Sequence, residues 1–192
     1  QVARALLEAG AAVDQVDGKG WTPLIWASQN GHVQVALALL KEGANVNHSA
    51  NDGRTALMQA SKNGHEGIAR ALLNENADVN AKMTSMVGGV DTVNAKNGAS
   101  SLMLASENGH EQVARALLEK GAEVDATDEE GWTALIWASQ NGHGQVALVL
   151  LKEGANVNNS ANDGRTALML SAQTGHEKIA LALLKEGANV NH

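Results

Sequence analysis

Five histidines recur at one position of the sequence, each directly after a glycine: His32, His65, His110, His143 and His176. Imidazoles ligate metals and transfer protons, so the series could form a metal site or a set of general bases. Steps of 33 residues, with one of 45, place them in successive structural units. Packed helices lie about 10 Å apart, whereas zinc holds its ligands at about 2.0–2.1 Å. We therefore expect no metal and no cofactor, and a hydrogen-bonding role at helix starts and inter-unit loops.

Serines recur in the same way, at Ser28, Ser61, Ser106 and Ser139. A serine nucleophile needs a neighbouring Asp–His pair, and the sequence places none beside these residues. Gly88-Gly89 lacks the spacing of a phosphate-binding loop. The Asn-rich segment 45–53 lacks the closing Glu of a calcium loop. The sequence therefore predicts a protein that is not an enzyme.

Composition narrows the class of protein further. The chain has 192 residues and a formal net charge of −7, which does not favour binding to a nucleic-acid polymer. An apolar content of 44% predicts a folded chain. The absence of Cys excludes disulfides and is compatible with a reducing compartment, so we expect a cytoplasmic protein. No apolar run approaches the roughly 20 residues of a membrane span.

Glycines mark a repeat with a period of 33 residues. Each of five glycines precedes a variant of Thr-Ala-Leu: Gly20, Gly53, Gly98, Gly131 and Gly164. The one longer step, 45 residues, equals 33 plus an insertion of 12. We therefore expect a single array over residues 1–192, made of a partial unit 1–16, units 17–49, 50–82, 95–127, 128–160 and 161–192, and an insertion 83–94.

Each unit carries the signals of two short helices. In unit 17–49 the first begins at Thr22-Pro23, where a hydroxyl can cap and Pro fits the first turn, and it ends at Asn30-Gly31. The second covers residues 33–40, with apolar residues on one face, and ends before Gly43. Neither helix can bury its apolar face alone, so the units must stack side by side.

Three segments of this unit resemble the ankyrin repeat: Gly-Trp-Thr-Pro-Leu at 20–24, Ala-Ser-Gln-Asn-Gly-His at 27–32 and Leu-Leu-Lys-Glu-Gly-Ala-Asn-Val-Asn at 39–47. The resemblance implies an all-α solenoid of stacked helix-turn-helix repeats joined by turn-rich, β-hairpin-like loops. The family's usual His after Thr-Pro-Leu is replaced here by Ile25, Met58, Met103, Ile136 and Met169. We expect packing to secure this position instead.

A longer repeat of 111 residues is superimposed on the short one. Residues 20–58 and 131–169 agree at 35 of 39 positions. This agreement indicates a duplication of three units plus one insertion.

Binding in such an array belongs to positions that differ between units, because the shared positions hold the stack together. The resemblance places the loops and the outward first-helix residues on a concave, partner-contacting face. The candidate partner-binding residues there are Trp21, Gln29, Arg54, Lys62, Glu107, Trp132, Gln140 and Arg165. Trp and Arg are enriched at hot spots, but Trp21 and Trp132 could equally pack along the neighbouring turn. Trp26 and Trp137 lie mid-helix, which predicts partial burial between helices.

The insertion 83–94 carries apolar residues around Gly88-Gly89. As an extended finger it would expose Met86 and Val87 to a partner, since exposed apolar patches often mark interaction sites. The alternative is that its side chains, Met83 among them, fold back over the adjacent loops.

These observations favour non-catalytic protein–protein recognition on the concave face. One alternative is a sensor of a small nucleotide-like ligand, in which a Trp stacks on a planar base and an Arg pairs a phosphate. Another is the targeting or regulatory array of a larger multidomain protein. We expect a protein partner, neither nucleic acid nor membrane, and a monomer that could associate end to end through uncapped terminal repeats.

Overall fold

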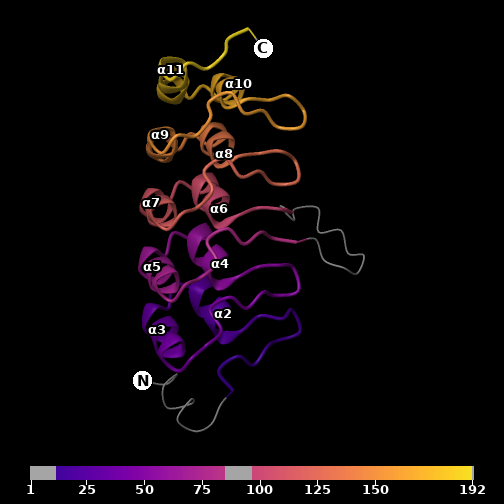
Figure 1. Ribbon diagram of the computed structural model, residues 1–192, viewed down its shortest axis with the longest axis vertical. Coiled ribbons are helices and arrows are strands. Elements are labelled where there is room, and N and C mark those ends of the chain that lie inside the picture. The colour runs from indigo at the N-terminus through magenta and orange to yellow at the C-terminus, as the bar shows by residue number, and fades with distance from the viewer. Residues whose placement is uncertain (1–11, 85–96, 192) are drawn as a thin grey trace.

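The computed structural model describes residues 12–84 and 97–191, which form an elongated stack of helix pairs (Figure 1). The candidates Met86 and Val87 lie outside these residues. The first helices of the pairs are α2 (Pro23–Gln29), α4 (Ala56–Lys62), α6 (Ser101–Glu107), α8 (Ala134–Gln140) and α10 (Ala167–Gln173). The second helices are α3 (Val33–Lys41), α5 (Glu66–Asn74), α7 (Glu111–Glu119), α9 (Gly144–Lys152) and α11 (Glu177–Lys185).

A side-chain hydroxyl starts every first helix. The Thr22 side chain accepts a hydrogen bond from the backbone N–H of Ile25, which satisfies one of the donors that a helix N-terminus leaves free. The same cap recurs at Thr55, Ser100, Thr133 and Thr166. The capping signal that the sequence placed at Thr22 is therefore confirmed in each described unit.

Stacking produces two columns of helices, with the first helices in one and the second helices in the other (Figure 1). Large side chains between them are fully buried, including Leu24, Leu57, Leu72, Leu102, Leu117, Leu135 and Leu150. The residues that replace the family's His, from Ile25 to Ile136, are buried in the same core. Packing therefore secures this position, as expected, except at Met169 of the last unit, which is exposed.

Hairpin-like loops project from the side of the first helices (Figure 1). In one loop, Ala50 N–H donates to the Arg54 carbonyl and Gly53 N–H donates to the Ala50 carbonyl, each over 2.9 Å. Adjacent loops are joined as well, because Asn51 N–H donates to the Lys19 carbonyl over 3.1 Å. Backbone hydrogen bonds thus join the first two loops, and bonds from Glu129 N–H to the Asn97 carbonyl and from Asn162 N–H to the Glu130 carbonyl join the last three, so that the loops form a layer along the stack.

Met83 makes the backbone hydrogen bonds of these loops. Its N–H donates to the Ala99 carbonyl over 3.0 Å and its carbonyl accepts from Gly98 N–H over 2.8 Å, the pattern that Ala50 makes one unit earlier. Its side chain is buried. The twelve extra residues therefore lie after Met83, between it and Gly98. The side chain of Met83 packs against the adjacent loops, as the second of the two interpretations predicted, and is not presented to a partner.

Deletion of residues 84–95 should leave the stack intact. The deletion joins Met83 to Lys96-Asn97-Gly98, a turn of the same length as Ala50 to Gly53. Since loop closure costs only about 0.6 kcal/mol per doubling of length, we expect the free energy of unfolding to change by no more than about 1 kcal/mol. Urea denaturation followed by helical circular dichroism measures this change. Loss of the folded state would show that the extra residues are part of the core.

Candidate functional site: the loop and first-helix face

The recurring histidines connect neighbouring units. His65 Nε2 lies 3.1 Å from the Gln29 carbonyl oxygen, at the C-terminal end of the first helix of the preceding unit. His110, His143 and His176 make the same contact with the carbonyls of Lys62, Glu107 and Gln140, over 2.8–3.2 Å. A helix C-terminus leaves such carbonyls without an internal partner. The predicted inter-unit hydrogen bonding is confirmed for these four histidines. The predicted bonding at the helix start is not, because the side chain of each N-cap histidine makes no capping hydrogen bond to its own helix.

Glycine makes this contact possible. Gly109 has a φ of +76°, which L side chains rarely adopt, and a Cβ there would lie 2.6 Å from His143 Nδ1. Gly31, Gly64 and Gly142 stand in the same relation to His65, His110 and His176. The Gly-His pairs of the sequence therefore hold neighbouring units together, because the His ring of each unit packs against the Gly of the unit before it.

The surroundings of His110 predict that stability depends on pH. Burial lowers the pKa of His110 below its ordinary value of 6.5, against the opposing effect of the Lys62 carbonyl. As the pH falls, His110 is therefore protonated at a higher pH in the unfolded chain than in the folded chain. The free energy of unfolding consequently decreases below about pH 6.5.

We expect the free energy of unfolding to decrease from pH 7.5 to pH 5.5, and to decrease less in His110→Gln. Urea denaturation of both proteins at the two pH values measures the difference. Equal decreases in the two proteins would show that His110 does not contribute.

Trp21 and Trp132 are buried, with 5% and 4% of their surface exposed. Each packs against the tryptophan of its own first helix, Trp26 or Trp137, with ring centroids 4.5 and 4.3 Å apart and ring planes tilted by 47° and 37°. Of the two interpretations offered for Trp21 and Trp132, packing along the turn therefore holds, because their rings lie within the hydrophobic core. Their assignment as partner-contacting side chains is corrected accordingly.

A carboxylate holds each tryptophan pair in place. Asp17 accepts from the backbone N–H of Trp21 over 2.9 Å and from Trp26 Nε1 over 3.1 Å. Asp128 does the same for Trp132 and Trp137, over 2.8 and 3.2 Å. The hydrogen bond from Trp21 N–H is the leading cause of the lowered pKa of Asp17. Sequence reasoning missed both carboxylates, although Asp at this position occurs only in the two described units that carry the Trp pair.

Trp26 is more exposed than its mid-helix position predicted. Its indole has 40% of its surface exposed, whereas Trp137 is partly buried as expected. At the same position Gln59 and Leu104 are buried. Trp26 and Gln29 lie three residues apart and so on one side of α2. At this end of the loop layer the exposed aromatic surface therefore belongs to Trp26 and not to Trp21.

Both arginines pair with a neighbouring aspartate, and Arg165 also lies beside a tryptophan of the preceding unit. The Arg165 guanidinium lies 5.0 Å from the centre of the Trp132 ring, and its Nε is 2.6 Å from Asp163 Oδ2. Arg54 pairs with Asp52 over 3.3 Å. Since Trp137 and Arg165 occupy the surroundings of the Trp132 ring, this geometry does not favour the alternative of a planar ligand stacked there.

The remaining candidates share one surface. Gln29, Glu107 and Gln140 are partly exposed and Lys62 is exposed, each at the last residue of its first helix. Together with other exposed or partly exposed residues of the loops and first helices, they form what we call the recognition face: Lys19, Trp26, Gln29, Arg54, Lys62, Glu107, Glu129, Glu130, Trp137, Gln140 and Arg165. The structure therefore brings all described candidates except Trp21 and Trp132 to this surface.

The serines at one repeat offset do not reach this surface. Ser28, Ser61, Ser106 and Ser139 are fully buried, so no substrate can contact their hydroxyls. Over residues 12–84 and 97–191, no group of three His, Cys, Asp or Glu side chains is placed to hold a metal ion. Nor is any helix in those two ranges long and apolar enough to cross a bilayer.

A family comparison now agrees with this architecture. The family described as "Ankyrin repeats (3 copies)" matches residues 1–83, 85–161 and 102–192. The chain belongs to the ankyrin-repeat family. Ankyrin repeats generally mediate protein–protein interaction and are typically non-catalytic. The comparison with curated proteins gives no match.

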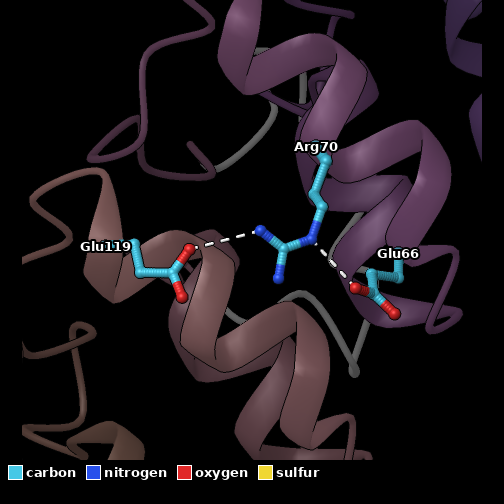
Figure 2. A network of polar contacts seen from close by, with 3 residues as sticks. All are labelled: Glu66, Arg70 and Glu119. Carbon is cyan, nitrogen blue, oxygen red and sulfur yellow. Dashed lines mark hydrogen bonds and ion pairs between the residues drawn. The ribbon is translucent and has the colours of Figure 1, made fainter.

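The opposite side of the ankyrin stack is formed by the second helices. There Arg70 of α5 contacts Glu66 over 2.9 Å and Glu119 of α7 over 3.2 Å, as Figure 2 shows. The hydrogen bond with Glu66 is the leading cause of the raised pKa of Arg70. Exposed pairs of this kind contribute little to stability, because water screens the charges. This network links the two units on either side of the extra loop residues, but it lies away from the recognition face.

Proposed function

We propose that this ankyrin-repeat array binds a protein partner on its recognition face. The observation that carries the proposal is the division between shared and varying residues. Contacts within the stack use the histidines, the glycines and the capping hydroxyls. The last residue of each first helix, by contrast, is not the same in every unit and is at least partly exposed: Gln29, Lys62, Glu107, Gln140 and Gln173. These residues project beside a rigid backbone layer, which limits the conformational entropy lost on binding.

Charge along the face supports a directional mode of binding. The first two described units contribute Lys19, Arg54 and Lys62, with Asp52 paired to Arg54. The later units contribute Glu107, Glu129, Glu130 and Asp163, with Arg165 paired to Asp163. A partner with an acidic part and a basic part would be oriented by this asymmetry, since complementary charge fixes register and speeds association.

The test compares two triple variants in affinity capture from the source organism. The first, Gln29→Lys, Lys62→Glu and Gln140→Lys, changes the recognition face. The matched control, Lys41→Glu, Gln112→Lys and Gln145→Lys, changes exposed residues of the second helices.

We expect the first variant to lose at least about tenfold of a captured partner, because it disrupts interface contacts worth more than about 1.4 kcal/mol. The control should retain that partner. Loss with the control but not with the first variant would place binding on the other face and contradict the proposal.

A further inference from the structure

The recognition face carries the same composite element twice. The first copy consists of Asp17, Trp21 and Trp26, followed by Asp52 and Arg54 of the next unit. The second consists of Asp128, Trp132 and Trp137, followed by Asp163 and Arg165. Contacts agree as well: each carboxylate binds the two tryptophans of its copy, over 2.9 and 3.1 Å in the first and 2.8 and 3.2 Å in the second.

The units between the copies lack the element. At the position of Trp26 they have Gln59 and Leu104, both buried, and at the position of Trp21 they have Arg54 and Ala99. α2 and α8 are separated by α4 and α6, which makes three steps along the stack. At about 10 Å per step, the two indoles lie on the order of 30 Å apart on one face of the stack.

The loop tips beside the two copies differ in charge. Gly18-Lys19 stands next to the first copy, whereas Glu129-Glu130 stands at the matching position of the second. All four residues are exposed. Each copy therefore offers a clamped indole for an apolar side chain, but with a cation beside the first and two anions beside the second.

We infer that the face holds two indole sites of the same construction, one at the exposed Trp26 and one at the partly buried Trp137, and that one protein partner occupies both together. The partner carries two apolar anchors in one chain, the first flanked by acidic residues and the second by basic residues. This inference rests on the proposed function and specifies the chemistry of that partner. Held indoles suit an anchor role because Trp is enriched at hot spots and the Asp clamp removes its rotational freedom before binding.

The probe is a library of random 12-residue peptides, selected on the wild-type chain alone and afterwards measured on the double variant Trp26→Gln, Trp137→Leu. Gln and Leu occur at the equivalent position of the two units in between, as Gln59 and Leu104, so the fold tolerates both residues there. Titration calorimetry then counts sites for a single selected peptide. We expect two peptides per wild-type chain, one per single variant and none for the double variant.

A tandem peptide tests the spacing and the charges. Two selected anchors joined by a linker that spans roughly 30 Å should bind one per chain, at least about 10²-fold tighter than one anchor. The tandem with acidic flanks on one anchor and basic flanks on the other should outperform a tandem with like flanks. Exchange of the charges in Lys19→Glu, Glu129→Lys, Glu130→Lys should reverse the copy that each single flanked peptide prefers.

The outcomes separate this inference from the proposed function. One site per wild-type chain, or selected peptides that ignore both tryptophan variants, would overturn the two-site inference. If those peptides still lost binding with Gln29→Lys, Lys62→Glu, Gln140→Lys, the recognition face would stand. Failure of every selected peptide to respond to that triple variant would count against the proposed function itself.

Discussion

Leu117→Ala should lower the free energy of unfolding by about 2–5 kcal/mol, the cost of truncating a large side chain in a closed core. Leu117 lies in α7, is 0% exposed and belongs to the continuous hydrophobic core. The cavity would open in the middle of the stack, where units on both sides limit relaxation. Chemical denaturation followed by circular dichroism measures the loss.

Leu181→Ala provides the matched control. Leu181 lies in α11 and is 58% exposed, so the same chemical change removes little buried surface. Surface substitutions of this kind typically change stability by less than about 0.5 kcal/mol. A loss below about 1 kcal/mol for Leu117→Ala, or equal losses in the two variants, would show that position 117 does not support the inter-unit core.

Gly109→Ala should cost about 2–4 kcal/mol, because backbone strain and displacement of a histidine act together. The left-handed conformation at Gly109 is strained for any residue with a Cβ, and the new methyl group would lie 2.6 Å from His143 Nδ1. His143 would have to move away from the Glu107 carbonyl, which its Nε2 contacts over 2.8 Å. Urea denaturation measures the total effect.

Gly121→Ala separates the two causes. Gly121 has nearly the same φ, +84°, but a Cβ there would meet nothing within 4 Å. We expect only the backbone cost, about 1–2 kcal/mol. The excess for Gly109→Ala is then the contribution of the Gly-His contact, and the imidazole proton shifts of His143 should change only in Gly109→Ala. No excess would mean that the histidine adapts without cost.

The sequence by itself determined the architecture of this protein. A constant period of 33 residues, capping residues such as Thr22 and glycines such as Gly31 act within a few residues of the chain, so their consequences can be derived locally. Recurrence at one position likewise predicts a role in the stack, which His65, His110, His143 and His176 take through their bonds to the preceding unit.

Tertiary structure decided which side chains of the candidate site are buried and which are exposed. Burial of Trp21 and exposure of Trp26 depend on how a loop folds against its own first helix, and the carboxylate of Asp17 that fixes this arrangement is nine residues from Trp26. The 33-residue repeat does not reveal such a contact, because the contact is confined to the units that carry the tryptophan pair; its signal in the sequence is that Asp occurs at this position only in those units. Met83 shows the same limit at the insertion, where only backbone pairing with Ala99 establishes that it belongs to the repeat. Sequence periodicity specifies which positions are equivalent, whereas side-chain packing between non-neighbouring residues determines which of them a partner can reach.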